Sequence, residues 1–414
     1  MQTRALQELG QRAETELRSD LLPFWLTHTI DRQNGGFYGR IANDLTVDRR
    51  ADKGLRLNAG ILSTFSRVLR VYGDEVYRRT ADRAFAYLMS HFRDTVGGGF
   101  YLRVNPEGRV VDASKRVSGQ ARCIYALAEY HVATGDSAAL AEAIRTYEIL
   151  ESYGRDSTRG GYYEACDLDA SRTGEPPANG LDRGESKSMR THLCVLESYT
   201  NLLQAWCSDE LRGRLRDLLR LFINRIVHPS TRHLRLFFDE AWLPCSDRYS
   251  FGHDMEASWL LVEAAQVAHD PAVLEAVQAG AVRLAEAVLA EGVDADGGIV
   301  GEADASGPVD TDKAWWSQAE AVVGFLSAFE LTKRAAMLDA ATRTWGFIER
   351  CVLDREYGEW FSTVSRGGIP SRDTFKVDAA KCPYHAARAC LEIMARTERI
   401  SSRAAALATA GRRV

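Results

Sequence analysis

The sequence predicts an all-α protein folded as a six-hairpin (α/α)6 barrel. Three observations support this prediction: a recurring glycine-aromatic cluster, apolar residues at helical spacing between the clusters, and the absence of a proline-rich or serine-rich linker. The clusters recur about 60 residues apart, except for one interval of about twice that length, which the stretch HLRLFFDE at 233–240 fills. The clusters lie at 35–40, 97–103, 160–165, 297–302 and 357–362.

The segments between clusters have the spacing of amphipathic helices. Ala81, Phe85, Leu88 and Phe92, for example, fall on one helical face. Each unit is therefore expected to hold two helices, with the glycine-aromatic cluster as the turn or short hairpin that joins them. Six helix pairs cannot each bury an apolar stripe alone, so they are expected to close into a ring of inner and outer helices. We predict one domain over 1–414, with a frayed tail at about 400–414.

Composition limits the partners and the location. A hydrophobic content of 45% allows a large core, and a net charge of −5 argues against nucleic acid or an anionic membrane as the main partner. The charged N-terminus does not resemble a signal peptide, and the eight cysteines form no CxxC pair, so a cytoplasmic protein is expected. No HxH or HExxH spacing is present, and we predict neither a metal nor a cofactor, in a monomer or homodimer.

The segment SFGHDMEASWLL at 250–261 has the strongest chemical content. His253, Glu256 and Trp259 are spaced to share one helical face. An imidazole, a carboxylate and an indole on one face can supply an acid or base, a hydroxyl acceptor and an apolar plate for a sugar ring. The structural alternative is a surface helix with a buried tryptophan.

Two further segments also indicate a sugar-binding site. In WWSQAEAVVGFL, Trp316 and Glu320 are four residues apart, and one of the two adjacent tryptophans is expected to face a cavity. In KCPYHAARACLEI, Pro383 places His385 near a helix N-terminus, where the helix dipole favours a neutral imidazole that can act as a base. A capping or structural histidine is the alternative. The three segments belong to different units, whose equivalent turns meet at one end of a closed barrel.

These three segments, and more loosely KSMRTHLCVLESYTNLLQ at 187–204, resemble the cellobiose 2-epimerase branch of the N-acylglucosamine 2-epimerase family, over about 22–398. The resemblance implies the same barrel and a small-molecule sugar substrate. It also implies that two histidines flank C2 of the open-chain sugar, one removing the C2 proton to give an enediolate and the other reprotonating the opposite face. The roles that the resemblance implies are proton transfer by His253 and His385, support or hydroxyl binding by Glu256, lining of the sugar ring by Trp259 and Trp316, and hydroxyl binding by Glu320.

Several positions depart from the family pattern. An arginine is expected where Gly60 stands, an asparagine at Arg190 and a histidine at Cys194. His192 is close in sequence to Cys194, but a helix would point the two side chains in different directions. The proton-transfer pair is thus kept while its surroundings change.

The other departures concern aromatic rings. Ser118 stands in place of a tyrosine, Arg122 in place of a phenylalanine and Ala380 in place of a tryptophan. The loss of stacking area and the gain of Arg122 and Arg190 suggest a monosaccharide or a modified, anionic sugar, because arginines are bidentate donors to anionic groups. The alternative is that Arg190 only restores the charge missing at position 60, or faces solvent.

Three other functions stay open at this point. An aldose-ketose isomerase similar to mannose isomerase would share the enediolate and return the proton elsewhere. A glycoside hydrolase would need two carboxylates across a cleft, for which Glu256 and Glu320 are the candidate pair. A non-catalytic sugar-binding barrel is the third alternative, and the altered positions 60 and 194 favour it.

Overall fold

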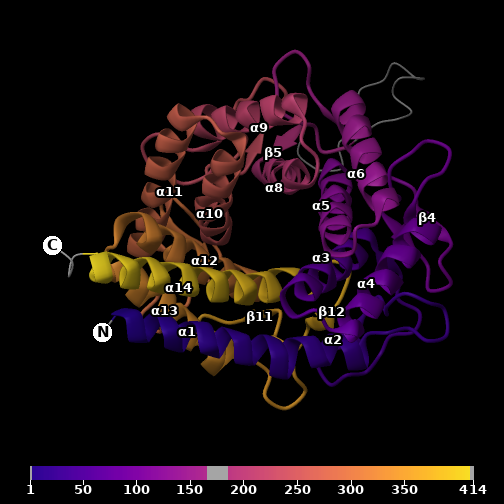
Figure 1. Ribbon diagram of the computed structural model, residues 1–414, viewed down its shortest axis with the longest axis horizontal. Coiled ribbons are helices and arrows are strands. Elements are labelled where there is room, and N and C mark those ends of the chain that lie inside the picture. The colour runs from indigo at the N-terminus through magenta and orange to yellow at the C-terminus, as the bar shows by residue number, and fades with distance from the viewer. Residues whose placement is uncertain (1, 166–184, 411–414) are drawn as a thin grey trace.

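A closed ring of helices lines the centre of the molecule (Figure 1). The computed structural model describes residues 2–165 and 185–410, with side chains as far as Arg403 in the last helix. Each inner helix packs on the next, and the last packs on the first, so the ring closes. The inner helices in the described residues are α3 (Leu55–Tyr72), α5 (Val117–Thr134), α8 (Met189–Ala205), α10 (Phe251–Ala268), α12 (Trp315–Thr332) and α14 (Tyr384–Ala410).

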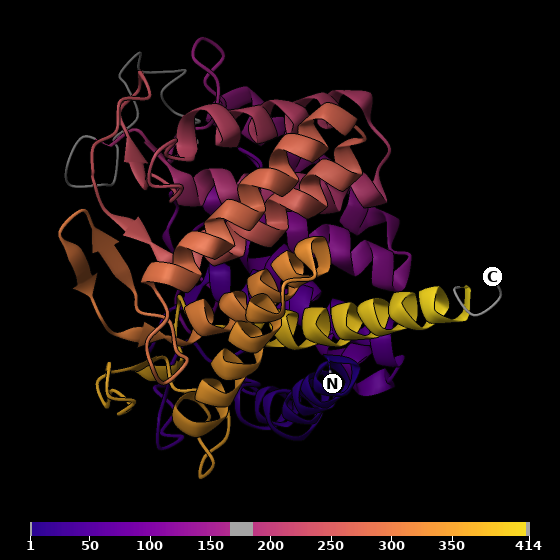
Figure 2. The same ribbon diagram turned by 90° about the vertical axis from the view of Figure 1, so that its left-hand side faces the viewer.

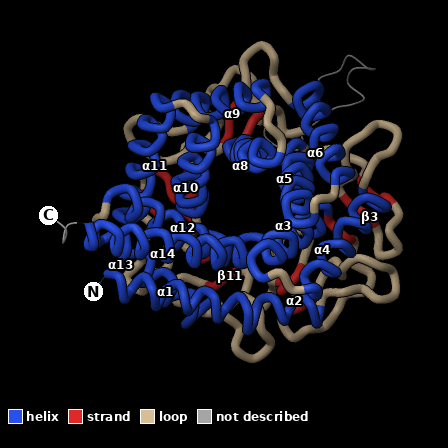
Figure 3. The backbone as a smooth tube through the Cα atoms, viewed as in Figure 1, coloured by secondary structure: helices blue, strands red, loops and turns tan. Residues whose placement is uncertain are grey.

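A second layer of helices surrounds the ring and covers its apolar outer face (Figure 3). Five of these outer helices continue into a π-helical turn, at Leu17–Leu21, Leu88–Phe92, Leu150–Gly154, Phe222–Ile226 and Ile348–Val352. None of the helices that the structure describes has both the length and the apolar character needed to cross a membrane. The outer helices are α1 (Gln2–Glu16), α4 (Glu75–Tyr87), α6 (Ser137–Ile149), α9 (Asp209–Leu221), α11 (Pro271–Glu291) and α13 (Ala335–Phe347), and the short α2 (Leu22–His28) follows α1.

Short antiparallel strands gather at one end of the barrel (Figure 2). They link the cluster of one unit to the residues just before the inner helix of the neighbouring unit, as in the pairing of Lys53 with Val104. The predicted six-unit α/α barrel is therefore confirmed. The strands are β1 (Ile41–Ala42), β2 (Lys53–Gly54), β3 (Arg103–Val104), β4 (Val110–Asp112), β5 (Lys187–Ser188), β6 (Phe237–Phe238), β7 (Tyr249–Ser250), β8 (Glu302–Asp304), β9 (Gly307–Asp310), β10 (Lys313–Ala314), β11 (Thr363–Val364) and β12 (Phe375–Val377).

A buried ion pair recurs at this end and explains the glycine-aromatic clusters. In the first unit, Asp31 accepts hydrogen bonds from the backbone N–H groups of the following turn, and the Lys53 ammonium lies 2.8 Å from its Oδ2. Gly35 and Gly36 then take positive φ angles, which glycine adopts without strain. In the first four units with such a lysine, the lysine lies two residues before the first residue of an inner helix, so the pair holds that helix start in place. The corresponding pairs are Asp94–Lys115, Asp156–Lys187, Asp294–Lys313 and Asp354–Lys376.

The tail that was expected to fray from about residue 400 is helical in the residues that the structure describes. Helix α14 continues to Ala410, and Ile400 is buried in the core. Arg399 and Arg403 both contact the Glu330 carboxylate of α12, since residues four apart lie on one helical face. Packing against α1 and this charge pairing keep the segment helical, and residues 411–414 lie outside the described chain.

Candidate active site

A cavity of about 160 Å³ lies inside the ring, near the strand-bearing end, and all six inner helices contribute to it. One half is lined by residues of α3, α5 and α8, namely Arg56, Arg122, Arg190, Leu193, Cys194 and Glu197. We call Arg56, Arg122 and Arg190 the arginine wall. The other half is lined by residues of α10, α12 and α14, namely His253, Glu256, Trp316 and His385. We call His253, Trp316 and His385 the histidine wall. The segments predicted to converge do so.

His253 lies in the first turn of α10, after the N-cap residue Ser250. Its Nδ1 is 3.0 Å from the Ser250 hydroxyl oxygen, and its ring centroid lies 4.6 Å from that of Trp316. Burial lowers the pKa of His253 to about 3, and the positive charges of the arginine wall add to this shift. The ring is therefore held neutral in the unliganded cavity.

His385 lies in the first turn of α14 and is held by a carboxylate. Its Nδ1–H donates to Glu320 Oε1 at 2.7 Å, and its Nε2 accepts from Arg56 Nη2 at 3.3 Å. This pattern assigns the proton to Nδ1 and leaves the Nε2 lone pair toward the cavity. Its ring centroid lies 5.7 Å from that of Trp316, so the two histidines contact the same indole. Burial, and then the nearby positive charges, lower the pKa of His385 well below its ordinary value.

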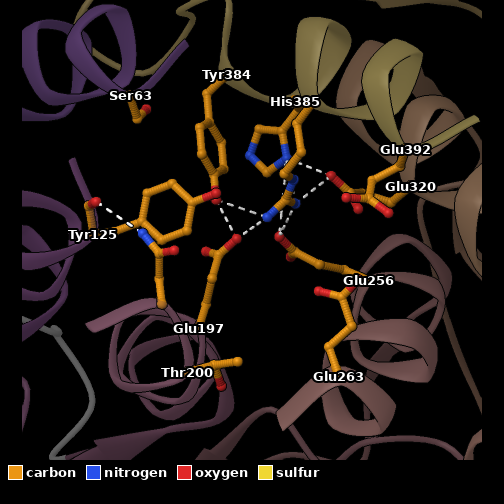
Figure 4. A network of polar contacts seen from close by, with 12 residues as sticks. Ser63, Tyr125, Glu197, Thr200, Glu256, Glu263, Glu320, Tyr384, His385 and Glu392 are labelled. Atoms are coloured by element: carbon orange, nitrogen blue, oxygen red, sulfur yellow. Dashed lines mark hydrogen bonds and ion pairs between the residues drawn. The ribbon is translucent and has the colours of Figure 1, made fainter. Parts of the chain in front are cut away.

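A buried carboxylate network lies behind His385 (Figure 4). Arg388 Nη2 donates to Glu320 Oε1 at 2.6 Å and to Glu256 Oε1 at 2.9 Å, and its Nη1 contacts Glu197. Tyr384 donates its hydroxyl to Glu197 as well. Burial raises the pKa of Glu256 and of Glu320. One guanidinium therefore lies at the centre of three carboxylates.

The same network contains the one described group of side chains whose spacing could suit a metal ion. Ligand atoms of Glu256, Glu320 and His385 lie within 4.8 Å of one another. Arg388 already binds both carboxylates, and Nδ1 of His385 already donates to Glu320. A cation there would have to displace the guanidinium, so these residues fit the arginine better than a metal.

The positions of Trp259 and Glu320 correct two of the predicted roles. Trp259 is buried outside the cavity lining, and its Nε1–H donates to Glu320 Oε2 at 2.9 Å. Glu320 is also fully buried and binds His385 instead of facing a sugar hydroxyl. The helical spacing placed these side chains on the correct face, but His385 and Arg388 of α14 lie between them and the cavity. Trp316 does line the cavity, as predicted.

The altered positions differ in their relation to the cavity. Arg122 and Arg190 line it, and so does Cys194. Ala380 is exposed and outside the lining, and Ser118 is also outside it. Because neither position belongs to the cavity lining, a loss of stacking area there stays a prediction from the sequence.

Position 60 is explained by packing. A Cβ added at Gly60 would collide with the sulfur of Cys382, so the Cys382 side chain leaves no room for a side chain there. Arg56, one helical turn earlier on the same face of α3, brings a guanidinium to the cavity. His192 is buried away from the cavity and accepts a hydrogen bond from the Tyr162 N–H, as its predicted orientation requires.

Sequence reasoning missed Arg56, Glu197 and Arg388. Helical spacing could have found them, because Arg56 precedes Gly60 by one turn, Glu197 follows Arg190 by two turns, and Arg388 follows His385 by one. The glycosidase alternative loses its candidate pair here. Glu256 and Glu320 share Arg388 and do not face each other across a cleft.

Comparisons with known proteins identify the family of this chain. A sequence model of N-acylglucosamine 2-epimerase (GlcNAc 2-epimerase) matches residues 36–389. The cellobiose 2-epimerase of Bacteroides fragilis is 39% identical over 387 residues, which cover 93% of this chain and 98% of the relative. The solved structure of cellobiose 2-epimerase from Bacillus thermoamylovorans superposes with a TM-score of 0.88 at 34% identity, over 94% of this chain and 100% of that one.

A more distant structure bears on the fold alone. D-Mannose isomerase has a TM-score of 0.82 at 18% identity, over 93% of this chain and 97% of that one. The Bacteroides fragilis relative is similar in sequence over almost the whole chain, whereas the similarity to the mannose isomerase shows the barrel fold alone. The chain therefore belongs to the N-acylglucosamine 2-epimerase family and is a carbohydrate 2-epimerase.

Proposed function

We propose that His253 and His385 exchange the C2 proton of an open-chain reducing sugar and so interconvert its C2 epimers. The observation that supports this most directly is that both imidazoles line one small cavity and contact the same tryptophan ring. Two groups that can carry a proton therefore face the same space. A C2 carbon placed between them would be reached from opposite sides.

Each turnover needs one neutral imidazole and one imidazolium. The neutral ring takes the C2 proton, the C–H electron pair forms the C1–C2 double bond, and the C1 carbonyl electrons move onto its oxygen to give an enediolate. The imidazolium then donates its proton to the other face of C2, and the C1 carbonyl re-forms. The enzyme ends with the proton on the opposite histidine, so atoms and charge balance.

Arg56 is placed to stabilise the enediolate. Its guanidinium lies beside the Nε2 of His385, where the reacting carbon must approach. Burial lowers the pKa of Arg56 to about 10, helped by repulsion from Arg190 and Arg122, so it stays charged near neutral pH. A fixed positive charge next to a developing oxyanion lowers the barrier most when, as here, it is already in place.

The substrate is proposed to be a small reducing sugar. Cellobiose is the sugar named for the Bacteroides fragilis relative, and it is therefore one of the sugars to test. The cytoplasmic location and the monomeric or homodimeric state stay predictions from the sequence.

The test is incubation of the enzyme with single sugars in D₂O, followed by NMR of the products. Epimerisation predicts deuterium at C2 and a second aldose that keeps its C1 aldehyde carbon. A ketose product would support the aldose-ketose isomerase instead. A complete lack of exchange at C2 across reducing mono- and disaccharides would rule out the proposed reaction.

A further inference from the structure

The arginine wall carries more positive charge than its surroundings balance. Arg122 has one carboxylate contact, a distance of 3.4 Å from its Nη1 to Glu197 Oε2, and Arg190 and Arg56 have no ion pair among the described residues. Arg190 is exposed, while the Arg122 side chain keeps 12% of its surface accessible. Most of the donor groups of these three guanidiniums are therefore available to a ligand.

Among the described residues, the ion-pair network of the site has one more guanidinium than it has carboxylates. The guanidiniums in and behind the cavity are those of Arg56, Arg122, Arg190 and Arg388. The carboxylates that contact them are those of Glu197, Glu256 and Glu320. Four cations thus face three anions even when every carboxylate is ionised. The first turns of α3 and α8 add partial positive charge at the same place, because helix N-termini carry it.

We propose that the substrate of this site is a monoanionic reducing sugar with a single ring, such as a hexuronate, whose charged group binds Arg122 and Arg190. This rests on the proposed C2 epimerisation and names its substrate class. Arg56 then remains for the enediolate oxygen, next to His385. The two walls place recognition of the anion and proton transfer on opposite halves of one cavity.

Size and charge both favour one charged ring. A cavity of about 160 Å³ is below the roughly 300–1,000 Å³ typical of sites for drug-sized ligands, so it suits one sugar unit. One negative charge balances the excess, whereas a dianionic phosphate would exceed it. A neutral sugar would bring no counter-charge to the largely buried Arg122 guanidinium, which is costly at low dielectric.

The requirement for proton transfer is a second reason to propose an anionic substrate. The reaction needs one imidazolium in the histidine wall, and the nearby arginines oppose that charge. An anionic group between Arg122 and Arg190 cancels part of their field, so the histidine pair can hold its proton. The substrate would thereby restore the protonation state that its own reaction requires.

The experiment compares glucuronate, glucose, glucose 6-phosphate and cellobiose as substrates of the wild-type enzyme, by the rate of deuterium entry at C2. Glucuronate is expected to have a kcat/KM at least about 10-fold above that of glucose, the factor that one good charged hydrogen bond provides. A kcat/KM for glucose or cellobiose equal to or above that for glucuronate would overturn the inference. A preference for glucose 6-phosphate would overturn its monoanionic part.

Variants localise the effect. Arg190→Gln is expected to lower kcat/KM for glucuronate by about 10-fold but not to lower that for glucose, since it removes one charged contact to the anion from an exposed position. Arg122→Gln should act in the same direction. Arg283→Gln, an exposed arginine of the outer helix α11 outside this cavity, removes the same charge and should change neither value. Equal losses for glucuronate and glucose would contradict the assigned role of Arg190.

Calorimetry separates this inference from the proposed reaction. His385→Asn protein should bind glucuronate without turning it over, and the double variant with Arg190→Gln should bind it about 10-fold more weakly. Binding with that dependence, but no C2 exchange of any sugar by the wild type, would refute the epimerisation and keep the anion site. C2 exchange that prefers neutral sugars would refute the anion site and keep the epimerisation.

Discussion

The two halves of the cavity differ in how their charges are balanced. Behind the histidine wall, Glu320 bonds to His385, Trp259 and Arg388 at 2.6 to 2.9 Å, so its oxygens have partners within the protein. In the arginine wall, the shortest ion pair among the described residues is the 3.4 Å contact of Arg122 with Glu197. Both halves are built from the same repeated helix pair, so the difference in charge balance arises from the side chains and not from the backbone.

The difference separates two tasks. A proton-transfer histidine, the role proposed for His385, must be held in one orientation and one tautomer before substrate arrives, and its contacts with Glu320 and Arg56 fit that requirement. A binding group gains affinity when its donors are unpaired in the free protein, and the arginine wall has such donors. Substitutions in the histidine wall should therefore change the rate of proton transfer, and substitutions in the arginine wall should change the preference among substrates.

The largest effect is expected from the histidine wall itself. His253→Asn and His385→Asn should each lower kcat by about 10²- to 10⁴-fold, because each removes a positioned acid or base. The measurement is epimer formation and C2 deuterium entry. His269→Asn is a matched control, since that residue is exposed at a left-handed position that asparagine tolerates. Near-normal activity of His253→Asn or His385→Asn would contradict the proposed role of the histidine wall in proton transfer.

The next effect concerns the support of His385. Glu320→Gln keeps the shape and removes the charge that orients Nδ1–H, so kcat should fall by roughly 10- to 10²-fold, less than on loss of the imidazole. KM should change little because Glu320 does not line the cavity. Circular dichroism and the midpoint of thermal unfolding check that the buried network survives. A rise in KM with kcat unchanged would mean that Glu320 binds substrate after all.

A smaller effect is expected at the other histidine. His253 is held by a hydroxyl, and Ser250→Ala removes a single neutral hydrogen bond at 3.0 Å. Such a bond contributes little net free energy, so kcat should fall by about two- to tenfold. The comparison with Glu320→Gln, made under the same conditions, measures how differently the two bases are supported. An effect of Ser250→Ala larger than that of Glu320→Gln would reverse this ranking.

The smallest effect is a displacement of the pH profile. Burial and the arginines lower the pKa of His253 to about 3, so its imidazolium becomes scarcer as pH rises above that value. Binding of an anion should raise this pKa. The alkaline limb of kcat, which reports the bound enzyme, should therefore lie at higher pH for glucuronate than for glucose.

The profile of kcat/KM provides the internal control. It reports the free enzyme, so its alkaline limb should be the same for both sugars. Arg190→Gln should move that limb to higher pH for both, since Arg190 is one of the charges that lower the pKa of His253. NMR titration of the imidazole protons gives an independent reading. Identical kcat limbs for the two sugars would show that the substrate does not alter the protonation of the pair.

The spacing of residues along the sequence predicted much of the fold and part of the site. The recurring clusters and the helical period of the apolar residues predicted six helix pairs, because both patterns act over one or two turns of chain. The same period placed His253 and Glu256 on one face, and both line the cavity. It could not show that Trp259 and Glu320 lie outside the cavity lining, because that depends on α14, whose His385 and Arg388 contact Glu320.

The sequence by itself predicted the ring of helices, the helix starts that line the cavity and the two histidines proposed to exchange the proton. Tertiary structure alone decided which charges are paired. His385 meets Glu320 from 65 residues away and Arg56 from 329 residues away. Whether an arginine is neutralised depends on distances of a few ångströms between such segments, since the energy of a charge pair changes steeply over that range at low dielectric. Helical periodicity contains no information on those distances, so the excess charge of the arginine wall emerges only when the ring closes.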